Sequence, residues 1–375
     1  MKRLARTTIY GTIAAAALCL ASGPSFAIEP GDFNATLAGA TIGIPTGALP
    51  PPGLYAGLQT FIGPNANGTG QNGTPPGANL TVFGEAIVPS LLWVPGWNFL
   101  GGSIGLVVIQ PFYTVGASVG QGAFNSIPPV DFGTGSFFEN IHNTIWQVVD
   151  SWNWKNGWFT SLGLAIQGPD GSTYNGTLNQ DYWTFSPIAG ISFINKQWKS
   201  TLNMEYDVHT ASEGHTGTFA AVNFLTTGGA GLPFPTSPDG CKGFNCPGIG
   251  WTSGNQFFAD WSIEYRWGKL AFGPAGDFKF QTTSDSPGQG WTCAELTNSP
   301  FYGRSLSCGK ATDISLGGII GYDMGPAELE VFAVDSVENK DDFHGWKIFT
   351  RLSFKLDDPS PKPEAAAAPM VGKAH

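Results

Sequence analysis

The stretch FADWSIEYRWGKLAFG, residues 258–273, alternates between two kinds of side chain. The polar set is Asp260, Ser262, Glu264 and Arg266, and the apolar or aromatic set is Trp261, Ile263, Tyr265 and Trp267. A period of two predicts a β-strand, because successive side chains of a strand point to opposite faces. In a soluble protein the charged face would contact water. Which face of this strand contacts solvent therefore depends on whether the chain is in water or in a membrane.

The first 27 residues have the order of a secretory signal peptide. Three basic residues precede an apolar run from Ile9 to Ala21, and small residues lead to Ala27, where we expect cleavage. A membrane anchor is the alternative, but the apolar run is shorter than the roughly 20 residues that span a bilayer. No run of that length occurs in residues 28–375, so we expect no transmembrane helix.

The composition favours a β-rich protein of a membrane. Charged residues make up 12% of the chain, whereas aromatic residues reach 13% and there are 52 Gly; soluble domains have about 25% charged residues. Such a composition in an exported chain is typical of outer-membrane barrels. Beyond the signal segment, 15 Lys and Arg stand against 28 Asp and Glu, which argues against nucleic acid or anionic lipid as a partner.

Runs of about 9 or more strand-like residues, the length of a tilted membrane strand, recur along the chain. We expect twelve strands near 54–62, 78–93, 101–115, 143–152, 157–167, 181–194, 199–208, 255–267, 269–281, 311–323, 327–336 and 345–356. Short turns alternate with long loops rich in Gly, Pro, Asn and Ser. The fold class predicted is all-β: a transmembrane antiparallel up-and-down β-barrel of about 12 strands, with short periplasmic turns and long extracellular loops.

The parts outside the strands complete the expected domain organisation. The signal peptide occupies 1–27, and a Gly- and Pro-rich segment, 28–53, lies in the periplasm or enters the lumen as a plug. The barrel covers 54–356, and 357–375 form a disordered periplasmic tail. The last strand, ending at Phe354, is similar to the closing strand through which barrels engage the assembly machinery, although here a tail follows it.

The alternation places most charged residues of the strands on the interior face. The candidates for lining the lumen are Glu205, Asp207, Asp260, Glu264, Arg266, Asp277, Lys279, Glu328, Glu330, Lys347 and Arg351. Two roles are open for them: pairing across neighbouring strands, or forming a polar lining that sets what passes through a narrow or partly plugged pore. The strand near 143–152 is less regular, because Asp150 shares parity with Trp146 and Val148.

Seven of the thirteen Trp lie at or beside the short turns. They are Trp93, Trp97, Trp152, Trp154, Trp158, Trp198 and Trp267. An indole ring is apolar with one polar N–H, so this placement predicts an aromatic belt at the membrane interface. Trp residues of an ordinary core would not collect at strand ends.

Four cysteines remain after the signal segment, Cys241 with Cys246 and Cys293 with Cys308. An even number in an exported chain predicts disulfides. Four cysteines allow three connectivities, and we expect each local pair to close its own loop. A metal site at CKGFNC is disfavoured, because no second pair and no His lie near it.

Other motifs suggest an enzyme only weakly. GASVG, residues 116–120, matches G-x-S-x-G, but that motif works on a strand-to-helix elbow and nothing after it looks helical. A barrel phospholipase would need a His beside its Ser, and the nearest is His142. HTASEGH, residues 209–215, could hold a metal, but such side chains in a Gly- and Ser-rich loop are more often solvated. We expect no enzyme, no metal and no cofactor.

The segment ALPPPGLYAGLQTF, residues 48–61, leads into the first strand. Together with the signal peptide, the strand spacing and the final strand, it resembles the outer-membrane family of the meta-pathway of phenol degradation, whose members begin their barrel with a PPPG-Tyr segment. The resemblance implies a channel in the bacterial outer membrane for passive uptake of small, aromatic or apolar solutes, and it supplies no catalytic or binding residues. The alternative is a non-conducting barrel with a structural or surface-contact role.

Overall fold

The computed structural model describes residues 36–64, 80–119, 130–133, 141–171, 182–211, 251–287, 310–340 and 345–357. The signal segment, residues 28–35, the four cysteines of the expected disulfides and the tail from residue 358 lie outside these ranges. The cleavage site, the disulfide pairing and the nature of the tail therefore stay predictions.

The described residues form strands joined by turns, with no helix long and apolar enough to cross a membrane. The strands are β1 (Gly53–Pro64), β2 (Leu80–Val94), β3 (Asn98–Phe99), β4 (Gly102–Ile109), β5 (Phe112–Val119), β6 (Val130–Gly133), β7 (Ile145–Asn153), β8 (Trp158–Gln167), β9 (Thr184–Ile194), β10 (Trp198–His209), β11 (Trp251–Thr252), β12 (Gln256–Trp267), β13 (Leu270–Gln281), β14 (Ser286–Pro287), β15 (Thr312–Asp323), β16 (Ala327–Lys340) and β17 (Trp346–Asp357).

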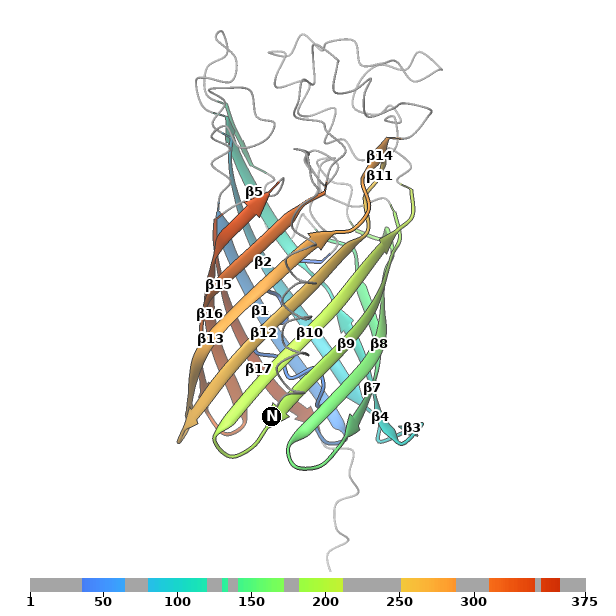
Figure 1. Ribbon diagram of the computed structural model, residues 1–375, viewed down its shortest axis with the longest axis vertical. Coiled ribbons are helices and arrows are strands. Elements are labelled where there is room, and N and C mark those ends of the chain that lie inside the picture. Colours follow the sequence, from blue (N-terminus) through green and yellow to red (C-terminus); the bar gives the residue numbers. More distant parts are fainter. Residues whose placement is uncertain are drawn as a thin grey trace, which may run out of the picture.

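Twelve of these strands form the wall of a closed antiparallel barrel (Figure 1). Around the wall they run β1, β2, β4, β7, β8, β9, β10, β12, β13, β15, β16 and β17. The last strand pairs with the first, with Leu58 opposite Leu352, so no edge is left at the closure. The predicted fold class is thereby confirmed, and closure satisfies the backbone hydrogen bonds that a bilayer cannot satisfy.

The expected strand 101–115 is divided, and this corrects the prediction of one continuous strand. β4 pairs with β2 and, up to Ile109, with β7, whereas β5 pairs with β2 and β6. Pro111 stands between β4 and β5 and has no N–H for the ladder. At the break, Gln110 contacts the connection before β7: its amide donates to the His142 carbonyl at 2.7 Å, and the Thr144 hydroxyl donates to Gln110 Oε1 at 2.7 Å.

The two faces of the wall are those predicted from the alternation in β12. Ser262 and Glu264 are fully buried on the inside, whereas Ile263 and Trp267 have exposed fractions of 44% and 73% on the outside. The apolar outer face is the one that contacts lipid in a membrane barrel. A charged residue with the parity of Glu264 therefore points into the lumen, and its partners must be sought there.

The predicted aromatic belt is present at the end of the barrel with the short turns. Its exposed members are Trp93, Trp97, Trp154, Trp158, Trp198 and Trp267. Trp152 is half-buried, and its indole N–H donates to the Leu100 carbonyl at 3.2 Å. That carbonyl belongs to the hairpin of β3, which projects sideways from the wall at this end (Figure 1).

Candidate functional site in the lumen

The chain before β1, residues 36–52, lies inside the barrel, where it folds into a series of tight turns (Figure 1). The N–H groups of Ala40, Ile42 and Ile44 donate to carbonyls three residues earlier, at 3.0, 3.2 and 3.1 Å. Such turns leave other backbone donors and acceptors unpaired, and buried backbone groups need partners. Side chains on the inner face of the wall supply these partners. We call residues 36–52 the N-terminal segment.

Asp260 of β12 receives the donors of the N-terminal segment. The backbone N–H groups of Gly39 and Thr41 donate to its carboxylate at 3.0 and 2.8 Å, and the Thr41 hydroxyl donates at 2.7 Å. Hydrogen bonds to an ionised acceptor are stronger than those between neutral groups. One inward-facing acid thus fixes two consecutive turns of the segment.

Two cationic side chains of β17 donate hydrogen bonds to carbonyl groups of the N-terminal segment. Arg351 donates to the carbonyls of Ile42 and Ala40 at 2.7 and 2.8 Å, and it also donates to Glu330 at 2.8 Å. Lys347 donates to the Ala38 carbonyl at 3.4 Å. Acids of the wall therefore bind N–H groups and cations bind C=O groups, so charge complements each end of the backbone dipoles.

Neutral side chains of β7, β9 and β10 hold the second half of the segment. The Asn203 amide donates to the carbonyls of Thr41 and Ile44 at 2.7 and 2.9 Å, and the Thr46 hydroxyl donates to Asn203 Oδ1. Gly47 N–H donates to Ser192 Oγ at 3.1 Å, while the Ser151 hydroxyl donates to the Gly47 carbonyl at 2.6 Å. The N-terminal segment is thus bound from both sides of the lumen.

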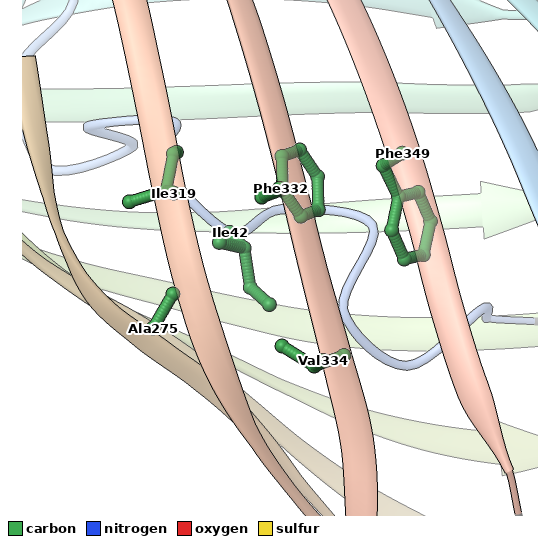
Figure 2. Packing of buried hydrophobic residues seen from close by; sticks show 6 residues of the cluster. All are labelled: Ile42, Ala275, Ile319, Phe332, Val334 and Phe349. Carbon is green, nitrogen blue, oxygen red and sulfur yellow. The ribbon is translucent and has the colours of Figure 1, made fainter.

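Apolar packing adds to these contacts. Ile42 is fully buried inside the lumen among side chains of β13, β15, β16 and β17, namely Ala275, Ile319, Phe332, Val334 and Phe349 (Figure 2). Gly43 follows at φ +80°, where a Cβ would also lie 2.6 Å from Ile319 Cδ1. A side chain at this position would be strained and crowded, so the close fit requires glycine.

We expect Gly190→Ala in β9 to displace this part of the segment. A Cβ at residue 190 would lie 2.7 Å from the Gly47 backbone nitrogen and 2.3 Å from Thr46 Oγ1, and the backbone atom cannot rotate away. Hydrogen exchange of the peptide containing Thr46 should become faster in the purified variant. Gly321→Ala is the matched control, because a Cβ at residue 321 would have its nearest neighbouring atoms at 3.5 and 3.8 Å. Equal exchange in both variants would contradict the packing of the N-terminal segment against β9.

The eleven charged candidates all lie on β10, β12, β13, β16 and β17, on one half of the wall. Seven of them are buried: Asp207, Asp260, Glu264, Asp277, Lys279, Glu330 and Arg351. The other four are half-buried: Glu205, Arg266, Glu328 and Lys347. The Thr36 hydroxyl donates to Glu205 at 3.0 Å. Arg266 forms no ion pair within the described ranges.

Two residues absent from the sequence candidates complete the ion pairs. Lys199 is 2% exposed and lies 3.1 Å from Glu264, 2.5 Å from Glu330 and 3.3 Å from Glu328. Asp313 of β15 lies 3.4 Å from Lys347, whose ammonium is also 2.8 Å from Asp277. Both residues have inward parity in their strands, and that signal could have identified them.

A cavity of about 930 Å³ lies between the N-terminal segment and the opposite wall. Its wall side chains on β2, β4 and β7 are mainly apolar and include Ala86, Val88, Leu92, Val107, Ile109, Ile145 and Val149, with Glu85 beside them. Leu49 lines it from the segment. The wall of β2, β4 and β7 is therefore the mainly apolar side of the cavity, whereas charged side chains such as Glu205, Glu330 and Arg351 line it from β10, β16 and β17.

The two ends of the cavity differ in character. At the end of the long loops, Tyr113 lines it in T-shaped contact with His142, their ring centres 5.4 Å apart. Burial lowers the pKa of His142, which lies in the connection before β7, to about 4, so this imidazole is neutral at pH 7. At the end of the short turns, charged residues such as Arg266 and Lys269 line the cavity.

The motifs that resemble enzymes do not form sites in the described residues. Ser118 of the G-x-S-x-G match lies within β5, opposite Thr81 of β2, so the strand-to-helix elbow is missing there. His209 is buried at the end of β10, where Nδ1 is 2.9 Å from the Thr184 hydroxyl. Within the described ranges no three His, Cys, Asp or Glu residues are grouped to hold a metal ion; Glu213 and His215 lie outside those ranges.

Two solved structures match the chain at low sequence identity, and the first of them shares its fold. The COG4313 outer membrane channel from Pseudomonas putida F1 is 9% identical, with a TM-score of 0.55 over 82% of this chain and 97% of that chain. The toluene transporter TbuX of Ralstonia pickettii is 12% identical, with a TM-score of 0.38 over 90% and 96% of the two chains. No curated protein sequence matches the chain.

A family profile gives the stronger relation. The profile described as putative MetA-pathway of phenol degradation matches residues 64–302, more than half of the chain. The match covers most of the wall strands and the intervening loops. This is the family that the sequence resembles, so the resemblance is confirmed, although residues 48–61 lie before the matched range. The protein is an outer-membrane β-barrel and belongs to the family of the putative MetA pathway of phenol degradation.

Proposed function

We propose that this barrel is a passive channel that takes up small, uncharged aromatic or apolar solutes across the outer membrane. The observation that carries the proposal is the cavity of about 930 Å³ with a mainly apolar wall on β2, β4 and β7. Sites for small apolar ligands are cavities of this size lined mostly by hydrophobic side chains. The family, whose description concerns phenol degradation, supports the same class of solute.

The charged candidates then have an indirect role. Most of them bind the N-terminal segment or one another, as with Asp260, Arg351 and the pairs of Lys199. They define the cavity by holding the segment against one half of the wall. We propose that the segment acts as a plug that narrows the lumen, and that the apolar half of the wall selects the solute.

A cavity-filling substitution tests the path of the solute. We expect Val107→Trp to reduce uptake of labelled phenol at low concentration relative to the wild type, because residue 107 lines the cavity and a larger side chain would narrow it. The measurement uses a deletion strain that expresses each variant at equal level. Val108→Trp is the matched control, since the adjacent residue points to the other face of β4. Equal uptake in the two variants would reject this path.

The second candidate is a non-conducting barrel used for envelope structure or surface contact. The dense hydrogen bonding of the N-terminal segment favours it, because a filled lumen would pass little. Conductance in planar bilayers together with the uptake assay separates the two functions. Absence of both ionic current and solute uptake in the wild-type protein would select the structural role.

A further inference from the structure

Three neighbouring short turns repeat one arrangement of side chains. Lys155 in the β7–β8 turn is next to Trp154, Lys196 in the β9–β10 turn is two residues before Trp198, and Lys269 in the β12–β13 turn is two residues after Trp267. All three lysines are exposed, and the Trp side chains have exposed fractions of 63%, 39% and 73%. The strands β7 to β13 are consecutive in the wall, so the turns are neighbours. We call these three lysines the basic arc.

One acid lies beside the basic arc, since the Asp323 N–H donates to the Lys269 carbonyl at 2.8 Å, but its carboxylate forms no ion pair with the arc among the described residues. The turns from 153 to 158, 195 to 198 and 267 to 270 contain no Asp or Glu, and no described side chain pairs with the three ammonium groups. The β15–β16 turn differs, because it carries Asp323, which accepts the Gly325 N–H at 2.7 Å. Positive charge is therefore gathered on one side of the periplasmic rim, although the chain as a whole has a net charge of −10.

The turns are also built to hold their shape. The Asn195 side-chain oxygen accepts N–H groups of Gln197 and Trp198, both at 2.8 Å. The Asn153 side-chain oxygen accepts the Lys155 N–H at 2.8 Å, and Lys155 itself has φ +67°. A non-glycine residue in this left-handed region needs support from its surroundings. These contacts fix where the basic arc points relative to the Trp belt.

We propose that the basic arc binds the phosphate groups of anionic phospholipids in the periplasmic leaflet of the outer membrane. Trp rings lie at the level of the lipid headgroups. Each Trp therefore holds the neighbouring Lys near that level, where its long side chain can reach a lipid phosphate. The net negative charge of the whole chain argues against binding of an anionic lipid. However, salt screens charges that are more than about 10 Å apart, so the charge of the nearby turns determines whether a phosphate group is attracted. Lys196 and Lys269 also line the short-turn end of the cavity, so the two surfaces adjoin there.

Lipid binding by the purified mature protein tests the proposal. Native mass spectrometry measures equilibrium binding of phosphatidylglycerol and of phosphatidylcholine with the same acyl chains, for wild type and for the variant Lys155→Gln/Lys196→Gln/Lys269→Gln. We expect the preference for phosphatidylglycerol to fall by about fivefold for each lysine removed. Lys310→Gln is the control, because Lys310 is exposed at the opposite end of the barrel and donates to the Thr282 carbonyl at 2.6 Å.

The results that would overturn lipid binding by the basic arc are as definite as the result expected. An unchanged preference in the triple variant, or equal binding of the two lipids by wild type, would overturn the proposal. Cosedimentation with peptidoglycan sacculi that the triple variant loses, at unchanged lipid binding, would assign the basic arc to peptidoglycan instead. Unaltered β circular dichroism and heat-modifiable gel mobility of the variant show that the barrel has folded, since the substituted residues are exposed turn positions.

Discussion

Deleting residues 28–49 is expected to raise the single-channel conductance of the protein by about fivefold or more, because a twelve-stranded barrel without its internal segment has a wider water-filled cross-section. The deletion removes Ile42 from the lumen and frees Asp260 and Arg351 from the backbone groups that they bind. Water then solvates these side chains. Planar-bilayer recordings of the refolded variant measure the change.

The control for this deletion is removal of residues 358–375, at the other end of the chain. That variant should keep the wild-type conductance, since it retains every contact of the N-terminal segment described above. A large conductance already present in the wild type, or no increase after deletion of residues 28–49, would contradict the proposed plug. This result is separate from solute specificity, which the Val107→Trp variant tests.

Lys199→Met is expected to lower the free energy of unfolding by about 3–5 kcal/mol, because it leaves the buried Glu264 carboxylate without its cation. Lys199 is 2% exposed and Glu264 is 0% exposed, so solvent cannot replace the pair. Glu330 retains Arg351 at 2.8 Å, whereas Glu264 has no second ion pair among the described residues. Urea unfolding of the barrel in lipid vesicles, followed by Trp fluorescence, measures the loss.

A double variant checks the cause of this loss. Lys199→Met/Glu264→Gln removes the uncompensated charge, so it should recover a large part of the stability lost by the single change. Lys310→Met, at an exposed position, should stay close to wild type. If Lys199→Met unfolds at the wild-type urea concentration, the ion pairs of the lumen contribute little to stability.

Strand periodicity was enough to predict the barrel and the inward direction of its charges. In β12 the alternation places Glu264 inside and Trp267 outside, as the structure has them. The division of the strand was not predicted, because the partner changes on one side only: β4 and β5 both pair with β2, but on the other side β4 pairs with β7 and β5 pairs with β6. A local pattern reports the direction of a side chain but not which strand lies beside it.

The fold class, the faces of the strands and the aromatic belt can be predicted from the alternation of side chains, because a period of two and the low dielectric of lipid act on each strand separately. The role of the charges depends on contacts that form only in the folded barrel. Asp260 binds the amides of Gly39 and Thr41, more than two hundred residues earlier, and Arg351 binds the carbonyls of Ala40 and Ile42. Such partners have no sequence signal, since they meet only when the barrel closes around the N-terminal segment and leaves one apolar wall facing the cavity.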